Sequence, residues 1–523
     1  MKKIVCLISI VSFLFCLTSC DKTTSPDNIP FTGSINGDST VLLMVNDTFR
    51  IRITPADASV TYAINVDNTY KSPRQGVISV SADGRVKALE AGKIAVSVKN
   101  NAGQFNFSVV VVALPGSVLL KDTAVLIKTG RSSQAVLDHV YDQYEQKMLG
   151  GITWEMLNSN LATVSGSGEI TALKEGETKL RVHVKNYPAV YSDYTVRILD
   201  YFVYVLGDCL NDLNYVRNCY WKNDLAVASD LYKTSFIASG ILFSNNNIYK
   251  VGTSTVPQRA YMLKNATETL FSESGAGATG VAMMGDDVYT AGFYTASGTK
   301  TVALWKNNAL SPILTQTEIN SESIGTTIAV SAGDTYVGGY IKNSQNIQVA
   351  CYWKNKQRVD LSDGTANAIV NSVFVDGADV YAAGNYAGVV GGFVYSIACY
   401  WKNGVKTDLI NAGSDARSIS LSQGDIYIAG NYLTSNAPTA CYWKNGIKVD
   451  LVTGAGVKWS TTSSMKIADN NVFISGFYQN NNDKYIGCYW KNGIRVDLKP
   501  TKFINGTDVE IYQYSSTNDL AIE

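Results

Sequence analysis

Apolar and polar residues alternate along short segments between residues 416 and 451, which is the pattern of half-buried β-strands. Turn signals separate these segments: Gly424-Asp425 follows the first, and Asn445-Gly446, the strongest short hairpin signal, precedes the last. β-Branched and aromatic residues, which favour strands, are frequent within them. The predicted strands are Ser418–Ser422, Ile426–Tyr432, Ala440–Trp443 and Ile447–Leu451. The segment therefore predicts four antiparallel strands joined by tight turns.

The same pattern recurs through residues 200–523, marked by versions of Cys-Tyr-Trp-Lys-Asn-Gly at intervals of 42 to 48 residues. The central position of each version is Trp221, Leu263, Trp305, Trp353, Trp401, Trp443 and Trp490. A repeat of this length with several short strands is typical of a β-propeller, in which each repeat is one blade. The chain is therefore predicted to be all-β, with a seven-bladed β-propeller at residues 200–523.

The two ends of the repeat region complement each other. The first unit begins at its second strand, Tyr201–Gly207, and Thr507–Gln513 looks like a first strand with no unit after it. We expect this C-terminal strand to pair with residues 201–207. Pairing there would close the ring and leave no open sheet edge.

Two further units, residues 33–113 and 114–199, precede the repeats, and their period-2 alternation is typical of β-sandwiches. Each unit contains, in this order, a strand, a Gly turn, a strand ending near Ala, a second Gly turn and a further strand. The segments are Gly76–Val96 in the first unit and Leu161–Leu180, preceded by Thr153-Trp154, in the second. Both resemble the bacterial Ig-like domain of group 2, although the first has Tyr62-Ala63 in place of Thr-Trp. The resemblance implies two Ig-like β-sandwiches that serve as extracytoplasmic spacer or adhesion modules.

The first twenty residues are typical of an export signal. Lys2 and Lys3 precede the apolar segment Ile4–Leu17, and residues 1–19 are therefore excluded from the fold prediction. Leu17-Thr18-Ser19-Cys20 resembles a bacterial lipobox, which implies cleavage before Cys20 and attachment of lipid to its thiol. Residues 20–32 are expected to be a flexible tether.

The domain order and the Tyr- and Asn-rich composition resemble envelope lipoproteins of the Bacteroides type. This resemblance implies a monomer held by its lipid in the cell envelope. The expected membrane is the outer one, with either the periplasmic or the surface face left open.

Charge and histidine content exclude several classes of function. Forty-four Lys and Arg balance 44 Asp and Glu, so no basic field for nucleic acid is expected. The only two histidines, His139 and His183, precede the repeats, which excludes histidine-dependent catalysis or zinc ligation in the propeller. No Cys-x-x-Cys or paired-histidine metal spacing occurs, and neither a metal nor a cofactor is expected.

The nine cysteines do not form a general disulfide framework. Cys6, Cys16 and Cys20 belong to the signal. Five others occupy one repeat position, one per blade, and should lie too far apart to be bridged: Cys219, Cys351, Cys399, Cys441 and Cys488. Cys209 and Cys219 share a blade, and a pairing across that hairpin remains open.

Long connections between the second and third strands and between blades should emerge at one end of the propeller, where binding residues are most expected. Examples are Leu310–Gly325, Asn385–Ile397 and Phe477–Tyr485. The candidate ligand contacts are four tyrosines at the ends of second strands, with a tryptophan placed in a crossing loop: Tyr294, Tyr386, Tyr432, Tyr478 and Trp459. Such residues suit hydroxyl-rich ligands such as glycans, but the tyrosines are also suited to packing between blades. The repeated tryptophans are predicted to be core residues.

Three functions remain compatible with the sequence. The first is a non-catalytic, membrane-anchored binding or adhesion protein whose long-loop face contacts a glycan or an envelope protein. The second is a carbohydrate-active enzyme that uses loop carboxylates, of which Asp363 and Asp415 are the candidates. The third is a scaffold subunit of an envelope complex.

Overall fold

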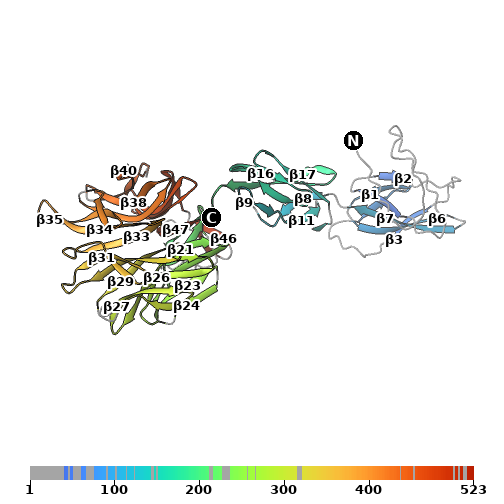
Figure 1. Cartoon of the computed structure of the whole chain (residues 1–523). Coiled ribbons are helices and arrows are strands. Elements are labelled where there is room, and N and C mark those ends of the chain that lie inside the picture. Colours follow the sequence, from blue (N-terminus) through green and yellow to red (C-terminus); the bar gives the residue numbers. More distant parts are fainter. Residues whose placement is uncertain are drawn as a thin grey trace. The chain divides into compact units, whose positions relative to one another are not determined.

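The structure is a computed structural model, and all of its described secondary-structure elements are β-strands (Figure 1). The described chain divides into two compact units, residues 1–200 and 201–523. The described residues are 40–44, 48–50, 61–65, 76–89, 92–100, 103–112, 115–122, 124–142, 147–148, 151–210, 216–226, 236–255, 257–265, 267–271, 273–314, 321–410, 412–435, 437–451, 454–498, 501–504, 507–510 and 515–523. The export signal, Cys20 and the tether lie outside them.

The first part of the N-terminal unit contains two sheets. One has the order β1 (Thr40–Met44), β7 (Gly103–Val112), β6 (Gly92–Asn100), β3 (Thr61–Asn65). The other has the order β2 (Thr48–Arg50), β5 (Arg85–Ala88), β4 (Ile78–Val80). Alternate residues of these strands, such as Val86, Val96 and Val109, form one hydrophobic core.

The second part of this unit contains three sheets around a core of its own. Their orders are β13 (Ile152–Met156), β16 (Gly176–Val184), β17 (Tyr187–Leu199), β9 (Ala124–Lys128); β12 (Lys147–Met148), β11 (Leu137–Asp142), β8 (Pro115–Leu120); and β10 (Ser132–Gln134), β15 (Glu169–Ala172), β14 (Ala162–Val164). Ile170, Leu180 and Val196 are fully buried among them. The predicted all-β packing of this segment is confirmed.

Among the described residues, the C-terminal unit contains seven antiparallel sheets of four strands. In sheet order they are β47 (Ser515–Ile522), β18 (Val203–Leu210), β19 (Val216–Lys222), β20 (Leu225–Ala226); β21 (Phe236–Ser244), β22 (Asn247–Thr255), β23 (Gln258–Lys264), β24 (Thr267–Leu270); β25 (Gly277–Met284), β26 (Asp287–Ala296), β27 (Thr299–Lys306), β28 (Ala309–Pro312); β29 (Ser323–Ser331), β30 (Asp334–Lys342), β31 (Gln348–Lys354), β32 (Gln357–Asp360); β33 (Ala368–Asp376), β34 (Asp379–Val390), β35 (Phe393–Lys402), β36 (Val405–Asp408); β37 (Ser414–Ser422), β38 (Asp425–Thr434), β39 (Ala437–Lys444), β40 (Ile447–Asp450); and β41 (Val457–Ala468), β42 (Asn471–Asn480), β43 (Tyr485–Lys491), β44 (Ile494–Asp497). We number these sheets one to seven in this order.

Sheet six shows how the repeat is built. Its four strands contain the four segments predicted from the alternation. Asn445 and Gly446 have φ of 50° and 80°, so both central residues of the β39–β40 turn are left-handed, as a type I′ hairpin requires. The turn residues thus specify where the third strand reverses into the fourth.

The repeated tryptophans are core residues, as predicted. Trp443 is fully buried, and its indole packs directly over Gly430 of the neighbouring strand. A Cβ atom at Gly430 would lie 2.7 Å from that ring and 2.0 Å from the backbone oxygen of Asp415. Glycine therefore permits two close approaches at one point, and Gly384 and Gly476 have the same arrangement under Trp401 and Trp490.

A β-bulge in each first strand links one sheet to the next. In five of the seven sheets, counting described residues only, the side chain of the bulged residue donates a hydrogen bond to a backbone oxygen of the following sheet. The pairs are Thr279 to Gly325, Thr326 to Val370, Asn371 to Ala416, Ser463 to Thr517 and Asn518 to Ala238. Each acceptor immediately precedes the bulged residue of its own sheet, so the same connection is repeated from sheet to sheet.

The strand that completes sheet one is β47, which pairs antiparallel with β18. The sequence-based choice of Thr507–Gln513 is therefore wrong. Thr507–Glu510 forms β46, which pairs with β45 (Thr501–Ile504) and places Val509 opposite Lys502 rather than against residues 201–207. Thr507–Gln513 alternates, whereas β47 has five polar residues followed by Leu520, Ala521 and Ile522, and it buries Leu520 in the core of sheet one. Alternation alone therefore selected the wrong strand.

The first strands of the seven sheets contact one another in cyclic order. β21 contacts β25, and the series continues through β29, β33, β37 and β41 to β47. β47 also contacts β21, beside which it lies in Figure 1. The first and last parts of the C-terminal unit are thus joined both within sheet one and between sheets one and two.

Candidate functional site

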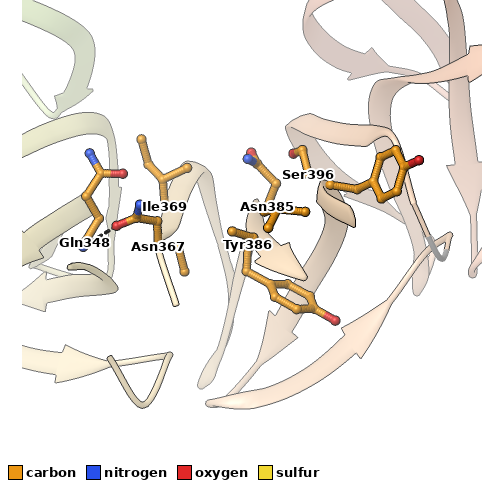
Figure 2. Close-up of a pocket in the computed structure, with 10 residues that line it drawn as sticks. Gln348, Asn367, Ile369, Asn385, Tyr386 and Ser396 are labelled. Atoms are coloured by element: carbon orange, nitrogen blue, oxygen red, sulfur yellow. Dashed lines mark hydrogen bonds between the residues drawn. The ribbon is translucent and has the colours of Figure 1, made fainter. Parts of the chain in front are cut away.

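A hollow of about 200 Å³ lies where sheets four and five meet. Figure 2 shows Gln348, Asn367 and Ile369 on one side of it and Asn385, Tyr386 and Ser396 on the other. Ala368, Ala387, Val394 and Tyr395 complete the lining. The lining combines three side-chain amides, a hydroxyl, two tyrosines and small apolar groups, with no charged side chain.

Asn367 holds one wall of this pocket in place. It lies directly before β33, and its Oδ1 accepts a hydrogen bond from the backbone N–H of Gln348 on β31, at 2.9 Å. Its backbone oxygen accepts from the N–H of Ala387 on β34, at 2.8 Å. A single asparagine therefore bridges sheets four and five. Its Nδ2 group has no protein partner among the described residues and can donate to a ligand.

The opposite wall is fixed from behind by sheet six. Asn371 Nδ2 donates to Asn385 Oδ1 at 3.0 Å and also to the backbone oxygen of Ala416. Ser396 Oγ donates to Asp415 Oδ1 at 2.8 Å. These bonds orient Asn385 with its amide nitrogen available and Ser396 with its oxygen available as an acceptor. The pocket thus presents donors and acceptors on a preorganised frame.

Tyr386 belongs to the pocket and also to a packing motif within sheet five. Its hydroxyl donates to Asp408 Oδ2 at 3.0 Å, and Lys406 Nζ lies 3.6 Å from its ring centroid. Burial is the main cause that raises the pKa of its hydroxyl. One face of the ring is therefore covered by Lys406, and the rest borders the hollow.

Two other predicted tyrosines have the same packing without the pocket. Lys448 Nζ lies 3.6 Å from the ring centroid of Tyr432 in sheet six. In sheet seven, Tyr478 lies under Arg495 and donates to Asp497 at 3.2 Å, and burial is the first cause that raises its pKa to about 12. This geometry agrees with the packing alternative for these rings.

The structure places the remaining two predicted contacts inside sheets. Tyr294 packs against the core between sheets two and three, and burial raises the pKa of its hydroxyl. Trp459 is not in a crossing loop as expected: it lies within β41, opposite Gln479, whose Oε1 accepts from its Nε1 at 2.7 Å. Its ring meets Phe477 and Tyr485 edge to face. Of the five predicted ligand contacts, only Tyr386 lines the pocket.

Sequence reasoning missed the other lining residues because it assigned residues 385–397 to a loop. The segment is instead part of a hairpin. Its strands β34 and β35 pair from Tyr381 opposite Lys402 to Val390 opposite Phe393, and the chain turns at Gly391-Gly392, both with positive φ. The long interval between second and third strands was the available signal. It singled out this segment, but which side chains face the hollow depends on the strand alternation.

The tip of this hairpin is apolar and exposed. Val389, Phe393 and Val394 are 72%, 69% and 71% exposed, and Tyr395 is 36% exposed. No charged residue occurs between Asp379 and Lys402. A contiguous apolar tip of this kind is unusual on a soluble surface and typical of a contact region.

The acidic residues of the C-terminal unit mostly have structural partners. Asp425 accepts from the Asn445 amide at 2.7 Å and pairs with Lys444 at 2.8 Å, so these groups lower its pKa; sheets three, four and five repeat this with Asp287, Asp334 and Asp379. Of the loop candidates, Asp363 accepts from the backbone and hydroxyl of Thr365, which lowers its pKa. An acid held in its ionised form is poorly suited to donate a proton.

Two features are absent from the described residues. Within that part of the chain, no group of three or more His, Cys, Asp or Glu side chains has the arrangement of a metal site. The same described residues contain no helix long and apolar enough to span a membrane.

Comparison with known proteins identifies one domain. Residues 116–192 match the bacterial Ig-like domain (group 2). The match falls within the second part of the N-terminal unit, where the sequence resemblance was the better one. A search of curated proteins finds no match.

Solved structures resemble the chain only loosely. The S-layer protein SbsC, domains 4 and 5, is 17% identical with a TM-score of 0.17, covering 28% of this chain and 81% of that one. A thermostable family-43 glycoside hydrolase is 10% identical with a TM-score of 0.30, covering 45% and 96%. A Mycobacterium tuberculosis puromycin-hydrolyzing peptidase is 9% identical with a TM-score of 0.38, covering 70% of this chain and 61% of that one. These likenesses carry no functional argument.

Proposed function

We propose that this protein is a lipid-anchored, non-catalytic binding protein of the bacterial cell envelope, with a saccharide pocket between the fourth and fifth blades of a seven-bladed β-propeller. The pocket itself carries the proposal. The Ig-like domain at residues 116–192 suggests a cell-surface binding or adhesion role. The lipobox-like sequence ending at Cys20 supports anchoring through lipid, and the outer membrane is the proposed location.

Three observations support a closed propeller. The C-terminal unit has seven four-stranded sheets, β47 completes the first of them, and the first strands contact in a cycle. In a closed ring of this kind, the sheet edges that remain are short and protected. The rigid frame then fixes Gln348 of sheet four against the lining residues of sheet five.

The chemistry of the pocket favours a neutral, hydroxyl-rich ligand. Amide groups of Asn367 and Asn385 and the hydroxyl of Ser396 match the donors and acceptors of sugar hydroxyls. Tyr386, Tyr395 and Val394 supply apolar surface for the C–H faces of a sugar ring. The absence of charge in the lining disfavours phosphate, carboxylate and cationic ligands. We therefore propose a neutral oligosaccharide, recognised over one or two residues in a hollow of about 200 Å³.

Binding can be tested with a matched pair of variants. The purified full-length protein would be screened against an array of neutral and acidic oligosaccharides, and the best ligand titrated. Tyr386→Ala is expected to weaken binding about tenfold or more, because it removes a lining ring. Tyr432→Ala removes a ring with equivalent packing in sheet six and is expected to change the Kd less than twofold.

Equal losses of affinity in both variants would show that the substitutions act through folding. Unchanged affinity in Tyr386→Ala would contradict a role of this pocket in binding. Recovery of the bound oligosaccharide intact after long incubation would support a non-catalytic role. Its cleavage would favour the enzyme alternative.

A second candidate function rests on the exposed hairpin tip. Val389 and Phe393 are positioned to contact another envelope protein, as a scaffold subunit would require. If this contact exists, Val389→Ser with Phe393→Ser will abolish cross-linking to a fixed partner in intact envelopes. Because neither residue lines the pocket, oligosaccharide binding should persist in this variant. Cross-linking that is unaffected by the double substitution would rule out the tip as the contact.

A further inference from the structure

Cys209 and Cys219 lie on neighbouring strands of sheet one. The register of β18 and β19 places Cys219 opposite Gly207, and Cys209 is two residues beyond Gly207 on the same strand. Residues two apart in a strand point to the same face. The two thiols are therefore diagonal neighbours on one face of one sheet.

The repeat shows why this arrangement is particular to sheet one. Sheets five, six and seven keep the same glycine and cysteine opposite each other, as Gly384 and Cys399, Gly430 and Cys441, and Gly476 and Cys488. Two residues beyond each glycine, these sheets have Tyr386, Tyr432 and Tyr478. Sheet one has Cys209 at that position. In sheet one, a second cysteine therefore occupies the position at which these three sheets have a tyrosine, next to the cysteine of the repeat.

Both thiols are enclosed in one core. Cys209 and Cys219 are buried with Val205, Trp221 and Leu520. Burial is the main cause that raises the pKa of the Cys219 thiol, and the neighbouring Cys209 thiol adds to the effect. Diagonal positions in a sheet are about 7–8 Å apart, slightly beyond the separation of about 7 Å that a disulfide spans without backbone movement. Both cysteines are free thiols in this structure, so closing the bond requires a small movement of the two strands.

We propose that Cys209 and Cys219 form an intrachain disulfide when the exported chain folds in an oxidising compartment. The thiolate of one cysteine attacks the disulfide of a thiol oxidant, such as oxidised glutathione, and releases one oxidant thiol. The second cysteine then displaces the other oxidant thiol and forms the S–S bond. The protein loses two protons and two electrons, and the oxidant disulfide is reduced to two thiols.

The timing follows from burial. In the folded sheet the thiols are protonated and shielded, so a soluble oxidant reaches them poorly. The exchange therefore belongs to folding, before Phe473 and Tyr489 of sheet seven pack against this face. Once formed, the bond ties the strand that opens the C-terminal unit to its neighbour.

Peptide mapping tests the proposal directly. The full-length protein would be reduced, refolded with a mixture of reduced and oxidised glutathione, denatured and alkylated without reductant. Trypsin cleaves after Arg197, Arg217 and Lys222, so the two cysteines fall in different peptides, 198–217 and 218–222. We expect one linked product, lighter by two hydrogens than the sum of the two. Alkylation of both separate peptides would overturn the proposal. Cys351, Cys399, Cys441 and Cys488, one per sheet, should be alkylated and serve as internal controls.

A stability measurement separates the disulfide from ordinary packing. Reductant is expected to lower the Tm of the refolded protein by about 3–5 °C, because the cross-link restricts the unfolded chain. Cys219→Ala should show no response to reductant. Alanine fits this position, since Ala303 occupies its equivalent in sheet three. An equal response in the variant would contradict the assigned pair. The refolding test does not depend on ligand binding or on cellular location.

Discussion

Trp443→Ala is expected to lower the free energy of unfolding of the C-terminal unit by about 3–5 kcal/mol, the usual cost of truncating a large buried aromatic side chain. Trp443 is fully buried over Gly430 and packs with Ile419 and Ile428 in a core shared by sheets five and six. Its loss leaves a cavity that the rigid strands cannot close. Urea unfolding followed by circular dichroism measures the change.

Trp459 supplies the control for this prediction. It is a tryptophan of the same unit but is only partly buried, in an aromatic cluster of sheet seven. Trp459→Ala is expected to cost about 1–2 kcal/mol. A loss in Trp443→Ala no greater than that in Trp459→Ala would contradict the assignment of the repeat tryptophan as the core of each sheet.

Lys250→Met is expected to stabilise the protein at pH 7 by about 2–4 kcal/mol, because it replaces a buried amine with an apolar side chain of similar shape. Lys250 on β22 is 3% exposed, and burial lowers its pKa to about 7. It pairs with Leu263, the one repeat position without tryptophan, and its Nζ lies 4.1 Å from the Tyr220 ring centroid. Lys250 is thus the cross-strand partner of the repeat position that has tryptophan in the other sheets.

The pH dependence follows from the direction of this shift. Between pH 7 and 9 the unfolded chain keeps the Lys250 proton while the folded chain releases it, so stability of the native protein rises with pH. The expected gain from this group is about 2–3 kcal/mol over that interval. It ends near pH 10, where tyrosines such as Tyr261, whose pKa is raised by burial, begin to favour unfolding. Urea titrations from pH 6 to 9 should show a slope for the native protein that is reduced in Lys250→Met. The same slope in both would contradict this role of Lys250.

The repeat made most of the C-terminal unit predictable from sequence. Alternation predicted the strands, and Asn-Gly pairs predicted the hairpins. The spacing of Trp401, Trp443 and Trp490 predicted both the length of the repeat and the buried residue of each sheet. These signals are local and occur several times, so each occurrence supports the others. The second Ig-like segment was recognisable for the same reason: its turns and strands follow a short, regular order.

The site was less predictable because it depends on contacts between sheets. The role of Asn367 comes from a hydrogen bond to Gln348, nineteen residues away, and that of Asn371 from a bond to sheet six. Neither residue differs in type from many other asparagines in the chain. Likewise, the closing strand is β47, which buries Leu520 against Val205 although its sequence does not alternate, and not the alternating segment Thr507–Gln513. Long-range packing, rather than local pattern, made these choices.

The most direct test of the proposed binding role is a crystal structure of the full-length protein with the neutral oligosaccharide selected by the array. We predict electron density for a sugar between Asn367 and Asn385, with its hydroxyls bonded to these amides and to Ser396. Sugar density at another position, or an empty pocket at a ligand concentration well above the measured Kd, would contradict the proposed saccharide site.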